Sequence, residues 1–315
     1  MKKIAPLQDL RGIAVLLVVM LHAQAITGYA IFPYSFGAIG VEIFFIISGF
    51  IMASIHGHDK GVSEFFLFLK KRVARIFPLY WFILFFFMSA ILYAGKGGDY
   101  HRNSGNIILN IFLLNDPSLS IHPYAWSLVY EMFYYYIFSV FVILFGLPVI
   151  IPALLLILLP VIFTSNSTDR DIIFLSHYNI YFGIGLFFGY YWEKIKFKII
   201  HSFIPFFLFI CMILYSFYGS NALCSLILCI FFFISYVMRG KSIKYINYIG
   251  TASYSIYLSH ALVIPVAISC VQSNLAYYPL LVLLCLIFGV VTHEYIEKYL
   301  VLFAGDALGV RRTRK

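Results

Sequence analysis

The sequence predicts an all-α, polytopic integral membrane protein with about ten transmembrane helices and both termini in the cytoplasm (N-in/C-in). Of its 315 residues, 63% are hydrophobic and only 11% are charged, whereas soluble domains carry about 25% charged residues. The apolar residues are gathered into segments long enough to cross a bilayer, and the basic residues concentrate in alternate connections between them. These observations exclude an ordinary soluble domain.

Ten segments are apolar and long enough to be candidate spans, because a helix needs about 20 residues to cross the hydrocarbon core. They cover residues 10–31, 36–55, 76–95, 126–145, 148–164, 178–192, 200–218, 221–238, 247–270 and 277–303. Residues 107–114 are apolar but too short to cross, which fits an interfacial or re-entrant segment. We expect residues 1–315 to form one transmembrane domain with no appended soluble domain.

The 22 basic residues predict the orientation. With the N-terminus inside, all but three of them fall in the termini or in cytoplasmic loops; the exceptions are Lys96, Arg102 and Arg170. The positive-inside rule predicts this asymmetry. The net charge of +9 is therefore attributed to topology, so we expect membrane lipid around the protein and no nucleic acid partner.

The cysteines are interpreted as packing residues. All five lie in predicted spans: Cys211, Cys224, Cys229, Cys270 and Cys285. They form no CxxC pair, and no cysteine and histidine cluster has the spacing of a zinc site. No metal is expected.

Two ionisable residues lie in the first apolar segment, Arg11 and His22. Eleven residues make roughly three helical turns and about 16 Å of rise, so both side chains lie on nearly the same face of a helix. Charged or titratable side chains within a membrane span are costly and mark functional sites. We therefore expect Arg11 near the cytoplasmic surface and His22 about 20 Å above it.

Three further ionisable residues fall at a similar depth. Glu42 is expected roughly 9 Å and Glu131 about 7–8 Å below the outer surface, and His260 about 20 Å above the inner one. Convergence on one cavity explains four such groups better than four separate exposures to lipid. A single buried histidine is more often a hydrogen-bonded core residue, and an isolated Glu42 could simply join two helices.

Arg72 and Arg75 lie three residues apart at the start of the third span, on one helix face. This spacing lets both guanidinium groups hold a phosphate, although such a cluster also satisfies the positive-inside rule. With Arg11 at the same interface, the pattern favours an elongated ligand whose anionic head is inside. The outer loop 96–125 is polar enough either to hold a hydrophilic acceptor or to be a solvated connector.

Five sequence blocks occur in one order over about 250 residues. They are Leu10-Arg11-Gly12 leading to His22, the block Gly40–Phe50, the basic block Lys71–Tyr80, the block Trp126–Tyr134, and the block Ser253–His260. In this order they resemble the membrane-bound acyltransferase-3 family, bacterial integral-membrane enzymes that O-acylate surface carbohydrates.

The resemblance implies about ten transmembrane helices and a cytoplasmic acyl-CoA donor, usually acetyl-CoA, used as a cosubstrate with no bound cofactor. It also implies essential roles for the residues that match the arginine and histidine of the first helix and the later arginine pair: Arg11, His22, Arg72 and Arg75. Glu131 corresponds to the acidic residue of the Trp-Ser-Leu block. Two positions depart from the family: Glu42 replaces the more common Asp, and Glu297-Lys298-Tyr299 replaces Glu-Lys-Pro, so no role is assigned there.

The chain looks most like short members of the family that act as exopolysaccharide or O-antigen acetyltransferases in the bacterial inner membrane. The expected function is transfer of an acetyl group to a hydroxyl of a cell-surface or exported polysaccharide, or of its lipid-linked precursor. His22 and Glu131 are the expected catalytic residues, and Arg11, Arg72 and Arg75 are expected to bind the donor. The supporting residues are Glu42, Ser127, Trp126 and His260.

His22 is expected to act as a general base on the acceptor hydroxyl, or to form an acyl-histidine intermediate. A different class stays open, because a proton-coupled secondary transporter also gathers His and Glu side chains in a polar layer. The arginine pair argues against it, since a proton-coupled carrier has no need of a phosphate clamp.

Overall fold

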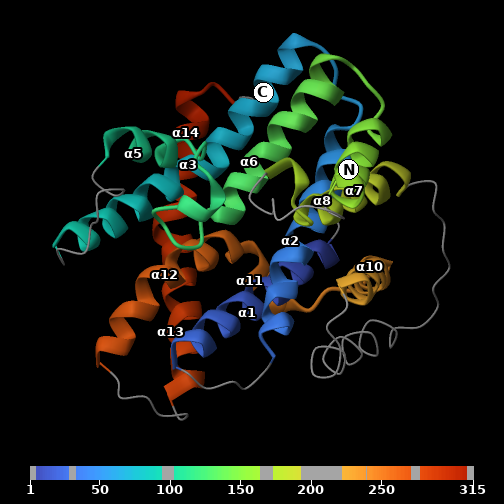
Figure 1. Cartoon of the computed structure of the whole chain (residues 1–315). Coiled ribbons are helices and arrows are strands. Elements are labelled where there is room, and N and C mark those ends of the chain that lie inside the picture. Colours follow the sequence, from blue (N-terminus) through green and yellow to red (C-terminus); the bar gives the residue numbers. More distant parts are fainter. Residues whose placement is uncertain are drawn as a thin grey trace. The chain divides into compact units, whose positions relative to one another are not determined.

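The computed structural model describes residues 5–27, 33–93, 103–163, 173–192, 222–238, 240–270 and 277–310. In these ranges every regular element is a helix, as Figure 1 shows with the helices labelled. The all-α prediction is confirmed for this part of the chain.

The longest helices are α1 (Ala5–Thr27), α2 (Tyr34–His56), α3 (Val62–Tyr93), α10 (Ala222–Met238), α12 (Ser253–Cys270) and α13 (Tyr277–Thr292). The shorter ones are α5 (Ser104–Ile111), α6 (Trp126–Phe138), α7 (Ile150–Phe163), α8 (Tyr178–Tyr191), α11 (Lys244–Thr251) and α14 (Lys298–Ala307). Two π-helical segments, η2 (Ser139–Leu144) and η4 (His293–Glu297), extend α6 and join α13 to α14.

Five helical stretches of the described residues are long and apolar enough to cross a membrane: Ala5–Ala25, Phe36–His56, Val62–Tyr93, Trp126–Leu144 and Tyr277–Ala307. A sixth crossing is possible if α11 and α12, bent by 69° at their junction, form one broken span. The other predicted spans contain shorter helices, except 200–218, which lies outside the described residues. The structure therefore supports a helical membrane protein, while ten crossings and the N-in/C-in orientation stay predictions.

The chain divides into two compact units, each made of two separate stretches of sequence. The first unit comprises Met1–Ile55 and Tyr181–Val290, and the second comprises His56–Ile180 and Val291–Lys315. His22, Glu42 and His260 belong to the first unit, whereas Arg72, Arg75 and Glu131 belong to the second.

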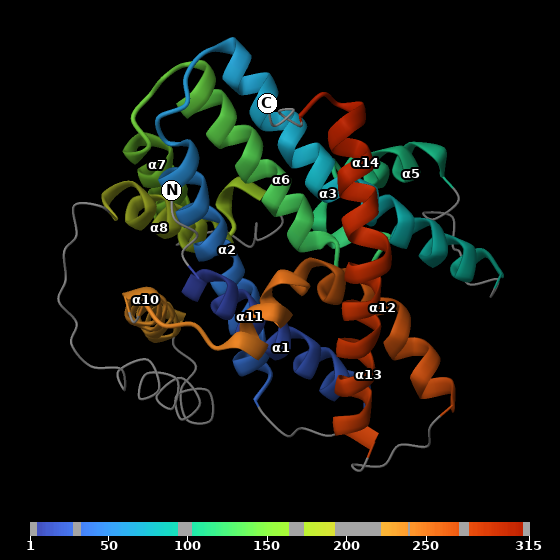
Figure 2. The ribbon, with the colours of Figure 1, turned by 180° about the vertical axis from the view of Figure 1, so that it is seen from behind.

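In the first unit, α1 packs along α11, as both views show (Figures 1 and 2). Glycines permit this close approach: a Cβ atom at Gly250 would lie 1.7 Å from the Gln8 carbonyl oxygen, and one at Gly12 would lie 2.4 Å from that of Ile246. The Leu10-Arg11-Gly12 block therefore includes a packing residue, Gly12, directly beside Arg11.

Asp9 anchors the start of α1 in the first unit. Its carboxylate is fully buried and accepts hydrogen bonds from Ser242 Oγ (2.7 Å), Asn247 Nδ2 (2.8 Å), the backbone N–H of Ile243 (2.7 Å) and Tyr236 Oη (3.2 Å). Ile243 is the N-cap of α11, so the negative charge also lies at the positive end of that helix dipole. Asp9 thereby fixes the helix that carries Arg11 and His22.

Gly49 on α2 is a second contact point that only glycine fits. A Cβ atom there would lie 2.2 Å from the Phe182 carbonyl oxygen on α8, and one at Gly185 would lie 2.2 Å from that of Ile46. Small residues at helix interfaces allow such backbone contact in membranes. We expect Gly49→Val to separate α2 from α8. The substitution should lower the free energy of unfolding of the detergent-purified protein by at least about 3 kcal/mol, the scale of severe overpacking.

Gly305→Ala is the matched control for Gly49→Val. A Cβ atom at Gly305 on α14 meets nothing within 4 Å, and alanine is a better helix former by about 1 kcal/mol. Stability should be unchanged or slightly raised. An equal loss of stability in the two variants would contradict the α2–α8 contact.

In the second unit, α3 packs against α14 and η2 (Figure 2). Tyr80 Oη and Trp81 Nε1 on α3 donate hydrogen bonds to the carbonyl oxygens of Asn110 (2.7 Å) and Ile111 (2.9 Å), which holds the end of α5 on α3. The expected short segment 107–114 is thus a helix followed by a turn. At the other end of α3, the Gly61 N–H donates to the Ile143 carbonyl oxygen at 2.8 Å. This hydrogen bond fixes the turn that precedes α3, the helix that carries Arg72.

Candidate functional site

His22 and His260 contact each other in the first unit. His22 Nδ1 on α1 lies 2.9 Å from His260 Nε2 on α12. The ring centroids are 5.0 Å apart and the planes differ by 20°, so the nearly parallel rings meet edge to edge through their nitrogens. His260 is fully buried. Two of the four ionisable residues that the sequence placed at one depth are therefore brought together.

α1 also carries Arg11, and the helix is continuous between Arg11 and His22. The expected spacing of about three turns along one helix is therefore realised. Arg11 is partly exposed at the end of α1 that is anchored by Asp9.

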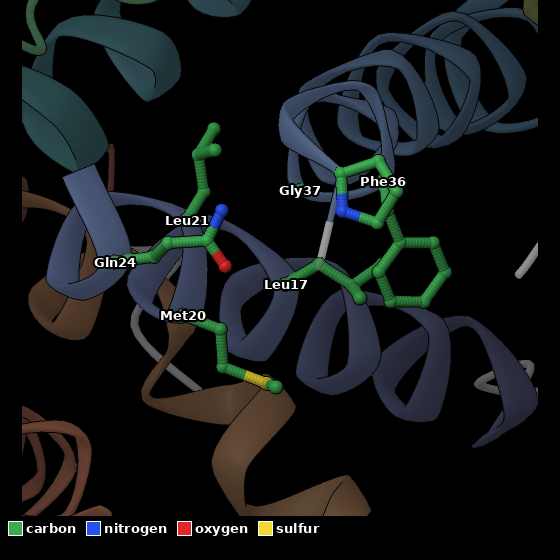
Figure 3. Close-up of a pocket in the computed structure, with 7 residues that line it drawn as sticks. Leu17, Met20, Leu21, Gln24, Phe36 and Gly37 are labelled. Carbon is green, nitrogen blue, oxygen red and sulfur yellow. The ribbon is translucent and has the colours of Figure 1, made fainter. Parts of the chain in front are cut away.

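An apolar pocket lies beside the C-terminal half of α1. Figure 3 shows its lining side chains between α1 and the start of α2, and its cavity volume is about 10 Å³. Its lining residues are Leu17, Met20, Leu21, Gln24, Pro33, Phe36 and Gly37. His22 contacts α12 and is not among them, so this pocket opens on a different face of α1 from the histidine pair.

Glu42 on α2 contacts α10 in the first unit. The Cys229 thiol on α10 donates to Glu42 Oε2 at 3.4 Å. The Cys229 side chain is fully buried. This contact gives Glu42 a role in joining α2 to α10, which is the structural alternative that the sequence left open.

Arg72 is held by a relay in the second unit. Its Nη2 lies 3.0 Å from His56 Nε2, and His56 Nδ1 lies 2.7 Å from Asp59 Oδ2. Because a guanidinium can only donate, His56 Nε2 accepts and His56 Nδ1 carries the hydrogen toward Asp59. The Arg72 guanidinium carbon also lies 5.1 Å from the Phe68 ring centroid and 5.3 Å from that of Tyr135, within cation–π range.

One donor of Arg72 is not used within the described structure. The Arg72 Nε is buried and has no hydrogen-bond partner among the described residues. Buried donors normally have a partner, so an orphaned guanidinium N–H is suited to an anionic ligand. The phosphate-binding role of Arg72 stays a prediction.

Glu131 lies beside the same aromatic ring. The Tyr135 hydroxyl, one helical turn later on α6, donates to Glu131 Oε1. Tyr135 therefore contacts both the Arg72 guanidinium and the Glu131 carboxylate. The expected catalytic role of Glu131 together with His22 stays a prediction, because the two residues belong to different units.

Arg75 has a partner that the sequence did not indicate. Its Nη1 forms a 2.7 Å ion pair with Glu297 Oε1, and Glu297 Oε2 lies 2.6 Å from His293 Nδ1. Glu297 is fully buried, whereas the Arg75 side chain is 39% exposed. His293 and Glu297 are the first and last residues of η4, a π-helical segment of the kind that often marks functional sites.

The two supporting residues of the Trp126–Tyr134 block lie at the start of α6. The Ser127 hydroxyl donates to the Tyr124 carbonyl oxygen at 3.4 Å. The Trp126 ring lies 5.1 Å from that of Tyr178 and 6.2 Å from that of Tyr130. These contacts fix the beginning of the helix that carries Glu131.

The apolar helices and the polar side chains within them define a helical membrane protein. The acyltransferase-3 family model, described as an acyltransferase domain, matches residues 8–294. The chain therefore belongs to the acyltransferase-3 family, as its sequence blocks predicted. This membership favours an acyltransferase over a transporter.

Two curated proteins are similar to parts of the chain. The exopolysaccharide production protein ExoZ of Rhizobium meliloti (strain 1021) is 31% identical over 126 residues, which is 38% of this chain and 38% of that protein. Protein 2 in the picA locus of Rhizobium radiobacter is 38% identical over 76 residues, 24% of this chain and 38% of that protein. The chain thus spans about two fifths of the length of these relatives. No solved structure gives a significant match.

Proposed function

We propose that this protein is an O-acetyltransferase that moves an acetyl group from cytoplasmic acetyl-CoA to a hydroxyl of an exported or cell-surface polysaccharide, or of its lipid-linked precursor. The observation that carries the proposal is the family match over residues 8–294. The similarity to an exopolysaccharide production protein favours a glycan acceptor. The bacterial inner membrane is the proposed location, with membrane lipid around ten crossings in the N-in/C-in orientation.

The donor is proposed to bind at the cytoplasmic end of the second unit. Arg72 and Arg75 hold the phosphates of acetyl-CoA, assisted by Arg11. Arginine suits this task because its fork donates two parallel, charge-assisted hydrogen bonds to phosphate. The His56–Asp59 relay limits the rotamers of Arg72, and the buried Arg72 Nε–H has no partner among the described residues. Acetyl-CoA acts as a cosubstrate, and no bound cofactor is proposed.

The transfer step is proposed to occur at His22. A ring nitrogen of His22 takes the proton of the acceptor hydroxyl as the hydroxyl oxygen attacks the thioester carbonyl carbon. A new C–O bond forms, and the C–S bond breaks with its electron pair leaving on sulfur. The proton then passes from His22 to the thiolate, which gives free CoA thiol and the acetyl ester. An acyl-histidine intermediate is the alternative route to the same products.

Arg72→Ala should weaken donor binding more than it affects the transfer step. Removing charge-assisted hydrogen bonds worth about 1.5–3 kcal/mol raises the dissociation constant for acetyl-CoA about 10- to 100-fold. Isothermal titration of the purified protein with acetyl-CoA measures this change. Lys70→Ala is the matched control, because it removes one positive charge from an exposed position on the same helix. An unchanged affinity for acetyl-CoA in Arg72→Ala would contradict the proposal that Arg72 binds the donor phosphates.

The function itself is tested with purified protein in lipid vesicles. Radiolabelled acetyl-CoA is supplied together with polysaccharide isolated from a strain lacking this protein, and both labelled polysaccharide and released CoA thiol are measured. We expect the two products in equal amounts. Solute flux without any transfer of label would instead indicate a proton-coupled transporter.

A further inference from the structure

The contacts of the histidine pair determine which ring nitrogens donate hydrogen bonds and which accept them. His260 Nδ1 lies 3.1 Å from the carbonyl oxygen of Ile256, one turn earlier on α12. A carbonyl oxygen only accepts, so His260 Nδ1 carries the hydrogen. In the neutral ring, His260 Nε2 then holds a lone pair and can only accept.

The hydrogen-bond roles of His260 also determine those of His22. Its Nδ1 lies 2.9 Å from His260 Nε2, so His22 Nδ1 must donate. The hydrogen of neutral His22 is thereby placed on Nδ1, which leaves the lone pair on Nε2. Neutral histidine in water prefers the opposite arrangement, with hydrogen on Nε2.

We propose that His260 is the positioning residue that holds His22 in the Nδ1–H tautomer and so makes Nε2 of His22 the base. This inference rests on the proposed function, because it names the atom that accepts the proton of the sugar hydroxyl. When that proton arrives at Nε2, the Nδ1–H bond to His260 stays in place and stabilises the imidazolium. A carboxylate has the same role in a Ser-His-Asp triad; here a neutral imidazole provides the acceptor.

The residues around His260 hold this arrangement of hydrogen-bond donors and acceptors in place. His260 is fully buried, and the Tyr257 ring lies beside it with centroids 5.8 Å apart. Gly289 on α13 lets that helix pack directly on Ile256, since a Cβ atom there would lie 2.5 Å from the Ile256 Cα. Ile256, whose carbonyl oxygen accepts from His260 Nδ1, thus lies where α12 meets α13.

Nitrogen NMR of protein with isotopically labelled histidine tests the tautomer directly. A scalar coupling across the N–H···N bond identifies the paired rings in the unmodified protein. We expect both paired rings to carry hydrogen on Nδ1, whereas exposed His58 should carry it on Nε2 as in water. Hydrogen on Nε2 of the His22 ring, or no coupled pair, would overturn the proposal whether or not acyl transfer is observed.

Two substitutions test the consequence for the reaction. His260→Leu removes the acceptor while keeping the site filled, and should lower kcat about 100- to 10,000-fold with little change in KM for acetyl-CoA. His260→Gln places an amide oxygen near the former Nε2, so it should recover most of the lost kcat. Unchanged kcat in His260→Leu would show that His260 only fills space, and equal loss in both variants of a folded protein would show that a hydrogen-bond acceptor for His22 is not its role; either result would overturn the proposal. Absence of acyl transfer in the unmodified protein would count against the proposed function, while the NMR result would still decide the tautomer.

Discussion

Replacing His22 with alanine is expected to lower acetyl transfer by about a hundredfold to ten-thousandfold, the usual contribution of general acid–base catalysis. The substitution removes the only nitrogen that we propose takes the hydroxyl proton. The rate of label transfer from acetyl-CoA to polysaccharide, measured at saturating donor, checks this expectation. Donor affinity should change little, because the proposed phosphate clamp lies on α3.

His58→Ala is the control for His22→Ala. His58 is exposed in the turn after α2, and its removal should leave transfer unchanged. Both variants should insert into the membrane in normal amounts. Retained transfer in His22→Ala would remove this histidine from the mechanism.

Arg75→Ala is expected to destabilise the protein by about 3–5 kcal/mol, the cost of leaving one member of a buried ion pair uncompensated. The reason is the location of its partner: Glu297 is fully buried and its Oε1 lies 2.7 Å from Arg75 Nη1. Partial exposure of Arg75, at 39%, places the loss at the lower end of this range. Reversible unfolding in mixed detergent measures it.

The double variant Arg75→Leu, Glu297→Leu should be less destabilised than Arg75→Ala, because no charge is left buried. The pair Lys298–Glu294 is the surface control: it joins partly exposed side chains on the same segment at 2.5 Å. Lys298→Ala should cost less than about 0.5 kcal/mol. If the losses of stability caused by the separate Arg75 and Glu297 substitutions simply added in the double variant, the energetic coupling within this ion pair would be contradicted.

The sequence predicted much of the first unit because membrane burial makes polar residues conspicuous. A span with Arg11 and His22 on one helix is realised in α1, and counting depth from the span ends placed His22 and His260 in one layer. Depth is predictable since the rise per residue of a helix is constant. Lateral position is not, so counting could not distinguish His260, which contacts His22, from Glu42, which contacts Cys229.

Two buried carboxylates were missed for different reasons. Asp9 stands at the start of an apolar run, where an acidic residue looks solvent-exposed; its four donors come from residues 236–247, far away in the sequence. Glu297 lies in a block that departs from the family pattern, although the His293–Glu297 spacing of four residues is a detectable helical pair. The bend between α11 and α12 was also missed, because the two helices together are long and apolar enough for one span.

Transfer of the acetyl group across the bilayer can be measured in proteoliposomes. Protein is reconstituted and sorted by orientation, radiolabelled acetyl-CoA is supplied only on the side of Arg72, and polysaccharide only on the opposite side. We expect labelled polysaccharide in the compartment that contains no donor, and none with His22→Ala. Transfer only when donor and polysaccharide share a compartment would contradict this expectation.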